Sequence, residues 1–336
     1  MKRIIVGQIG IGHNHAQAII AAVRKRPDLF EIAGFCETDD VWLERRGNLP
    51  EYTGLPFLTE QQIIERCDAV FVETEVRNLL KTAKKCVDCG KHVHIDKPVM
   101  GRSEEYADLL KTAQSKGLIV QTGYMYRYNP AVKKCFEIVK SGKLGEIYSI
   151  NAEMSTRHDK EFREWLKNFP RGNMFIFGCH FIDLIVYLMG APEKITTISK
   201  VSGLDGINSV DLSQTVLEYA KAIAKIYVSS IEVNGWGRRQ FVICGSKGTL
   251  EIRPMENPCK LFYSDLANCT NAYMDIKSEI PVTEMPMDCR YDEMIEDFYH
   301  YVNGEKKNPF TYEHELLLKE VTDKVCKVKN RKIFRK

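Results

Sequence analysis

The first third of the chain alternates short apolar runs with helical patterns, and this alternation constrains the fold most strongly. The apolar runs lie at 2–9, 31–36, 69–73, 92–96 and 118–122, and the helical patterns at 16–25, 61–66, 77–90 and 103–116. Strands that alternate with helices over short connections form a parallel sheet with right-handed crossovers. The sequence therefore predicts an α/β, doubly wound sheet of the Rossmann type, in a first domain that covers residues 1–122.

The first apolar run leads directly into a glycine turn and a helix. In such a turn Gly10 suits the tight bend and Gly12 lets a pyrophosphate approach the backbone, where the helix N-terminus favours negative charge. The third glycine of the dinucleotide fingerprint is absent, and His15 stands in its place. Many strand-to-helix turns need glycine for geometry alone, so the turn by itself is weak support. With its context, it predicts a cofactor site lined by Gly10, Ile11, Gly12, His13 and Asn14.

Glu37 directly follows the second apolar run. An acid at this place accepts hydrogen bonds from the adenosine ribose diol of a dinucleotide. A carboxylate there repels a 2′-phosphate, so NAD is favoured over NADP, although Arg45 and Arg46 are close in sequence.

Lys97 stands where another apolar run ends, between Asp96 and Pro98. Proline lacks a backbone N–H and terminates the strand, so Lys97 is expected at the strand's carboxyl end. Open α/β sheets bind their ligands at this edge. A lysine there can transfer a proton to a substrate oxygen if burial or a neighbouring cation lowers its pKa. On these residues alone, an exposed loop lysine is the alternative.

Beyond residue 122 the pattern changes to long alternating strands with few helices between them. We expect strands near 147–155, 194–201, 211–219, 224–233, 239–244 and 249–253. They predict a second, α+β domain at 123–336 with a large, mostly antiparallel open sheet. Helices at 292–302 and 312–329 are expected to pack back on the first domain. A sheet with a free face often forms a subunit interface, so we expect a homodimer or homotetramer.

Composition excludes several classes of partner. The 48 basic and 45 acidic residues nearly balance, so no strong attraction to nucleic acid or to a membrane surface is expected. No apolar run approaches the length of a membrane span. The eleven cysteines are scattered without framework spacing, which predicts reduced thiols, a cytoplasmic location and no metal site.

Six motifs, taken in order, resemble the Gfo/Idh/MocA family, named for glucose-fructose oxidoreductase and inositol dehydrogenase. They are Gly10-Ile11-Gly12, Asp96-Lys97-Pro98, Gly123 to Pro130, Ser141 to Ile147, Gly178 to Asp183 and Gly245 to Leu250. The resemblance implies an NAD(P)-dependent oxidoreductase that transfers hydride between nicotinamide and a small molecule, namely a sugar, polyol or related hydroxy compound. It places Lys97 at the nicotinamide and gives Lys97 and His180 acid/base roles.

The same resemblance implies further contacts around this pocket. Thr74, Asp96 and Arg127 are expected to meet the cofactor. Asp183, Arg157 and His158 are expected to border the substrate, where a guanidinium fork suits carboxylates or hydroxyls. Trp236 stands between two glycines, and it either caps a sugar face or is an exposed hairpin aromatic.

Departures from the family pattern keep other functions open. Ile176 occupies the place of an aspartate that precedes the histidine in the family, and Asp96 replaces a glutamate. A nicotinamide-binding regulator without turnover is one alternative, and a non-redox enzyme with a tightly bound NAD is another. The intact Lys97 and His180 favour an enzyme.

Overall fold

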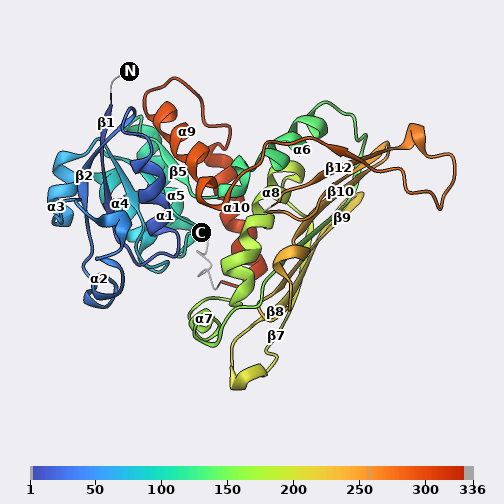
Figure 1. Ribbon diagram of the computed structural model, residues 1–336, viewed down its shortest axis with the longest axis horizontal. Coiled ribbons are helices and arrows are strands. Elements are labelled where there is room, and N and C mark those ends of the chain that lie inside the picture. The colour runs from blue at the N-terminus through green and yellow to red at the C-terminus, as the bar shows by residue number, and fades with distance from the viewer. Residues whose placement is uncertain (1–2, 257, 329–336) are drawn as a thin grey trace, which may run out of the picture. The chain divides into compact units, whose positions relative to one another are not determined.

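The computed structural model describes residues 3–256 and 258–328 (Figure 1). The chain divides into two compact units. The first contains Met1–Met125 and Asp288–Leu316, and the second contains Tyr126–Met287 and Leu317–Lys336. Helix α9 (Asp292–Val302) and the start of α10 (Tyr312–Cys326) therefore belong to the first unit. In the part of the chain described, no helix is both long enough and apolar enough to cross a membrane.

The first unit is built on a five-stranded parallel sheet with the order β2-β1-β3-β4-β5, which confirms the predicted Rossmann-type fold. Its strands are β1 (Ile4–Ile9), β2 (Phe30–Cys36), β3 (Ala69–Val72), β4 (His92–Ile95) and β5 (Val120–Thr122). Its helices, besides α9, are α1 (Ala16–Arg24), α2 (Asp40–Arg46), α3 (Glu60–Arg66), α4 (Leu79–Asp88) and α5 (Ser103–Ser115). The chain runs from β1 to β2 on one side and returns to β3 on the other, so the ligand crevice of this fold lies at the carboxyl ends of β1 and β3.

Local sequence explains where these elements begin and end. All four residues of β3 are buried, as expected for a strand covered on both faces. Helix α1 buries Ala16, Ile19 and Ile20 completely. Helix α2 was not predicted, and it starts because the Asp39 side chain accepts a hydrogen bond from Val41 N at 2.9 Å. The predicted first strand started at Lys2, which lies outside the described residues, and β1 begins at Ile4.

The second unit contains an eight-stranded sheet with the order β13-β12-β11-β10-β6-β9-β8-β7. All neighbouring strands are antiparallel except β6 and β9, which confirms the predicted mostly antiparallel sheet. Its strands are β6 (Ile147–Ser155), β7 (Lys194–Lys200), β8 (Leu212–Tyr219), β9 (Ala222–Ser229), β10 (Gln240–Gly245), β11 (Gly248–Ile252), β12 (Leu261–Asp265) and β13 (Ser278–Ile280). The last two strands were not predicted.

Helices cover one face of this sheet, as Figure 1 shows for α8. They are α6 (Pro130–Lys140), α7 (Lys160–Trp165) and α8 (Cys179–Met189). Phe181 of α8 stacks on Phe241 of β10, with ring centroids 5.6 Å apart and an 8° angle between planes. A π-helical turn at Met174–Gly178 directly precedes α8. The closing helix was predicted to reach Lys329, which lies outside the described residues; α10 ends at Cys326.

Candidate functional site

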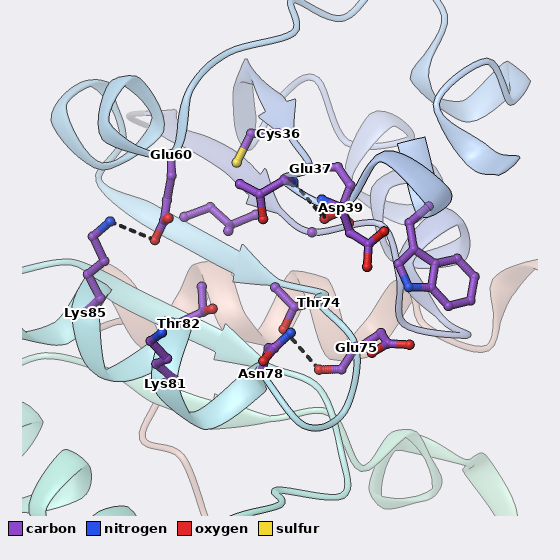
Figure 2. Close-up of a pocket in the computed structure, with 14 residues that line it drawn as sticks. Cys36, Glu37, Asp39, Glu60, Thr74, Glu75, Asn78, Lys81, Thr82 and Lys85 are labelled. Carbon is purple, nitrogen blue, oxygen red and sulfur yellow. Dashed lines mark hydrogen bonds and ion pairs between the residues drawn. The ribbon is translucent and has the colours of Figure 1, made fainter. Parts of the chain in front are cut away.

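A cavity of about 340 Å³ opens in the first unit, around the carboxyl ends of β1, β2 and β3 (Figure 2). Figure 2 shows Glu37 and Asp39 on one side of it, and Thr74 and Asn78 on another. The lining residues are Ile9, Gly10, Cys36, Glu37, Thr38, Asp39, Trp42, Glu60, Thr74, Glu75, Asn78, Lys81, Thr82 and Lys85. This is the crevice where a doubly wound sheet binds a dinucleotide.

The glycine turn forms one wall of the cavity and requires glycine at two places. Gly10 has a φ of +89°, and a Cβ there would lie 2.4 Å from the backbone nitrogen of Thr74. The turn therefore packs directly on the loop after β3, which brings the predicted residues Gly10 and Thr74 together. At Gly12 a Cβ would lie 3.1 Å from the Trp42 ring and from Glu75 N. The dinucleotide fingerprint has a glycine at this place, where a pyrophosphate approaches the backbone.

Glu37 ties the end of β2 to the glycine turn. Its Oε2 accepts a hydrogen bond from Ile11 N at 2.8 Å, and its Oε1 accepts from Thr38 N at 2.7 Å and Asp39 N at 2.9 Å. These three backbone donors hold the carboxylate at the cavity wall. A fixed carboxylate at this place can also accept hydrogen bonds from a ribose diol.

Arg46 holds the same turn from the other side. Its guanidinium donates hydrogen bonds to the carbonyl oxygens of Ile11 and His13, and it lies 4.6 Å from the Trp42 ring centroid. Its Nη2 lies 3.4 Å from the Asn14 side-chain oxygen. Because Arg46 is close to Glu37 in sequence, it was a possible binding residue for a 2′-phosphate. In the structure its guanidinium binds the backbone of the turn. Burial lowers the pKa of this guanidinium.

Lys97 follows β4 and its side chain is only 3% exposed, so the alternative of an exposed loop lysine is excluded. The preceding Asp96 turns its carboxylate toward two imidazoles. Nδ1 of His13 and Nδ1 of His15 each lie 3.1 Å from Asp96 Oδ2, and Lys97 N donates to Asp96 Oδ1 at 2.6 Å.

Two further buried ionisable residues, Glu73 and His94, adjoin Asp96, and sequence reasoning missed both. Burial, reinforced by Asp96, raises the pKa of Glu73 well above its usual range. The only sequence signal was that Glu73 directly follows one strand and His94 lies in the next, and these two strands are neighbours in the parallel sheet.

In the second unit, Arg127 and Asp183 form a buried ion pair with each other. His180, the second residue of α8, is 4% exposed, and its ring meets Tyr126 edge-on with centroids 4.9 Å apart. The Tyr126 hydroxyl donates to Glu256, whose carboxylate also pairs with Arg239 at 3.0 Å. His180 therefore sits beside a buried polar network. Ile176, at the place of the missing acid, is buried in the π-helical turn.

The three predicted substrate residues of the loops have different surroundings. Arg157 is exposed. The His158 ring stacks against Phe162 and Phe177, at centroid distances of 4.3 and 4.9 Å, and burial lowers its pKa to about 4. This value favours the neutral imidazole at pH 7. Trp236 is half-buried, with the Arg239 guanidinium 4.1 Å from its ring centroid.

Two family models match this chain. Residues 2–124 match an oxidoreductase family with an NAD-binding Rossmann fold, and residues 132–251 match a GFO/IDH/MocA C-terminal domain. Together they span most of the sequence.

Individual relatives are distant. A scyllo-inositol 2-dehydrogenase (NADP(+)) of Bacillus subtilis is 24% identical over 148 residues, which are 44% of this chain and 41% of that protein. A 2,7-anhydro-N-acetylneuraminate hydratase of Escherichia coli is 26% identical over 184 residues, covering 53% of this chain and 48% of that protein. The chain thus spans about half the length of these curated relatives. Among solved structures, a UDP-N-acetylglucosamine 3-dehydrogenase from Acidithiobacillus ferrooxidans has the same fold, with a TM-score of 0.78, 17% identity and 97% of each chain covered.

Proposed function

Because the chain belongs to the Gfo/Idh/MocA family of oxidoreductases, we propose that it transfers a hydride between a nicotinamide dinucleotide and a sugar, polyol or related hydroxy compound. The observation that carries the proposal is the cavity at the carboxyl ends of β1, β2 and β3, bordered by the glycine turn. A bound nicotinamide supplies the hydride donor or acceptor. The residues of the chain must bind it, orient it and move the accompanying proton.

The cavity suits the adenosine half of the dinucleotide. Glu37 and Asp39 line it from the loop after β2, and Thr74 lines it from the loop after β3. The two carboxylates favour a free ribose diol over a 2′-phosphate, so NAD is the proposed cofactor. Lys81 and Lys85 also line the cavity, but Lys85 pairs with Glu60 at 3.0 Å.

Proton transfer is assigned to Lys97 and His180. Lys97 has a buried side chain at the strand end that follows β4, at the ligand-binding edge of the sheet. As a neutral amine it would accept the proton of a substrate hydroxyl, and in the reverse reaction its ammonium would return that proton. His180 would share or relay the proton. A single positioned acid or base is worth about 100- to 10,000-fold in rate.

The test screens sugars, polyols and hydroxy acids as substrates. Turnover is measured by the absorbance of reduced nicotinamide. Lys97→Met should lower turnover by about 100-fold or more while it leaves nucleotide binding measurable. Lys84→Met, a change of a partly exposed lysine paired with Asp88 on α4, is the matched control and should retain full turnover. Equal activity of the wild-type and Lys97→Met proteins would defeat the proposed chemistry.

A non-redox reaction with a tightly held NAD is the second candidate, and the distant hydratase relative favours it. Such an enzyme would convert substrate by loss or gain of water, with no net change of nicotinamide absorbance. Mass spectrometry of the reaction mixtures separates the two enzymes. Cofactor binding without any conversion would instead support the regulator, which the replacement of the family's acid by Ile176 suggests.

The proposed assembly is a homodimer or homotetramer formed through the second face of the large sheet. On β6 this face carries Ser149, Asn151 and Glu153, all half-exposed. Light scattering coupled to size-exclusion chromatography would measure the mass of the assembly, and a monomer at micromolar concentration would contradict it.

A further inference from the structure

Five imidazole and carboxylate side chains converge in the first unit, between the glycine turn and the ends of β3 and β4. They form two groups that share Asp96: His13, His15 and Asp96 in one, and Glu73, His94 and Asp96 in the other. Four of them are buried, and the side chain of His15 is 17% exposed. His13 Nδ1 and His15 Nδ1 each lie 3.1 Å from Asp96 Oδ2. Ligand atoms around a tetrahedral zinc ion are about 3.3 Å apart, so these atoms already have nearly the required spacing.

The hydrogen bonds of His13 show which of its nitrogens carries the hydrogen. Nε2 lies 3.1 Å from the carbonyl oxygen of Lys97, which can only accept, so Nε2 is the donor. In the neutral imidazole Nδ1 then has no hydrogen, and it accepts a long hydrogen bond from His15 N at 3.2 Å. This bare nitrogen faces two carboxylates, at 3.1 Å from Asp96 and 3.6 Å from Glu73. A backbone carbonyl that fixes the far nitrogen is the usual support of a metal-binding histidine.

His94 is oriented in the same way by Gln121. The Gln121 amide nitrogen donates to Met294 O at 3.1 Å, so its oxygen faces His94 Nδ1 at 2.8 Å and must accept from it. The other nitrogen, Nε2, is then without a hydrogen. Among the residues that the structure describes it makes no hydrogen bond, and it points at Glu73 Oε1 from 3.9 Å.

Glu73 supplies the second, independent sign of a missing cation. It follows β3 and is fully buried, yet within the described ranges neither of its carboxylate oxygens has a hydrogen-bond partner. Nδ1 of His13 lies 3.6 Å from one of these oxygens, and Nε2 of His94 lies 3.9 Å from the other. A buried carboxylate is costly unless it is paired, hydrogen-bonded or bound to a metal.

We propose that a divalent transition-metal ion of the zinc class binds in this cluster, with His13, His15, Asp96 and Glu73 as ligands and His94 beside them. Imidazole and carboxylate together suit such an ion, and two positive charges would balance the two carboxylates. The ion would join the glycine turn to the ends of β3 and β4, next to Lys97. Sequence patterns gave no reason to expect a metal here, because the ligands come from three separate segments. The proposed metal site does not require that the protein transfers a hydride.

The test measures metal binding without any cofactor or substrate. Protein purified from cells grown with added zinc is analysed for its metal content per chain. Chelator-treated protein is then titrated with Zn²⁺, followed by calorimetry, and with Co²⁺, followed by visible absorption. The variants are His15→Gln and Asp96→Asn, and His314→Gln, outside the cluster, is the control. Cys89→Ser removes an exposed thiol that could bind zinc adventitiously.

We expect one zinc per chain in the wild type and in both controls. His15→Gln should weaken zinc binding by more than the roughly 10- to 100-fold that loss of a supporting residue costs. The cobalt spectrum should show weak visible bands without thiolate charge transfer. If the wild type binds no zinc, or if His15→Gln binds it as tightly as the wild type, the proposal is wrong. A protonated Glu73, without a metal ion, would then explain the buried carboxyl group. Because His15 is at the edge of the cluster, this variant keeps the test decisive even if Asp96→Asn fails to fold.

Discussion

The Arg127 guanidinium donates two parallel hydrogen bonds to the Asp183 carboxylate, from Nε to Oδ2 at 2.9 Å and from Nη2 to Oδ1 at 2.7 Å. Both side chains are 1% exposed. Bidentate pairs of this kind are among the strongest charge-assisted contacts. The sequence assigned the two residues separately, to cofactor and to substrate, and the pairing favours a shared structural role.

Asp183→Asn should destabilise the second unit, because it leaves the buried Arg127 charge without its carboxylate. The expected loss is about 3–5 kcal/mol of unfolding free energy, measured by urea denaturation. The double change Arg127→Met with Asp183→Leu should recover much of it, since both charges are removed together. Glu218→Gln, which breaks an exposed pair with Lys194, is the control and should cost about 1 kcal/mol or less. A loss below that of the control would refute a structural role for the pair.

Gly10→Ala should damage both stability and nucleotide binding. The new Cβ would meet Thr74 N at 2.4 Å in addition to the strain of a φ of +89°. Gly54→Ala separates these two effects, because Gly54 has a similar φ of +77° with nothing within 4 Å of the added carbon. The control should cost about 1–2 kcal/mol, and Gly10→Ala clearly more. Equal losses in thermal unfolding would show that Gly10 is not packed against the loop after β3.

His158 should make the protein less stable in mild acid. Its folded-state pKa of about 4 lies below the unfolded value of about 6.5, so the unfolded chain binds the proton more readily between these values. Its contribution to stability is therefore present above pH 6.5 and is lost as the pH falls toward 4. Between pH 7 and pH 5 the loss should be about 1–2 kcal/mol.

His158→Phe keeps the stack with Phe162 and Phe177 and removes the titration. Urea unfolding at the two pH values should therefore show a smaller acid-induced loss in this variant than in the wild type. An equal loss of unfolding free energy in both proteins would show that another group causes the acid sensitivity.

Glu37 should govern the choice between NADH and NADPH. Glu37→Gln removes the negative charge at the cavity wall, so the ratio of NADPH to NADH affinity should rise by about tenfold, the effect of 1.4 kcal/mol. Fluorescence titrations with both nucleotides measure this ratio. A wild-type protein that already prefers NADPH, as the name of the Bacillus relative indicates for that enzyme, would refute the proposed selectivity.

The fold could be predicted because its signals are local. Apolar runs, glycine turns and Pro98 mark the strands and their ends, and each parallel strand is followed by a helix. Strands β12 and β13 escaped detection because neither has a clear alternation of apolar and polar residues. Helix α2 depends on one side-chain cap, at Asp39.

The contacts of the buried charges could not be predicted. Asp96 meets His15 across 81 residues, and Arg127 meets Asp183 across 56. A single sequence shows the residues but not which way each side chain points. Asp96 was expected to meet the cofactor, and the sequence did not predict that its carboxylate contacts His13 and His15.

The most direct test of the account is a fluorescence titration of NADH into the wild-type protein and into Gly12→Val. A branched side chain at Gly12 would crowd the Trp42 ring and cover the backbone that the pyrophosphate must approach. We predict saturable binding of one NADH per chain, weakened at least about tenfold in a variant whose circular dichroism is unchanged. No saturable binding to the wild type, or equal affinities for the two proteins, would contradict a dinucleotide site at this turn.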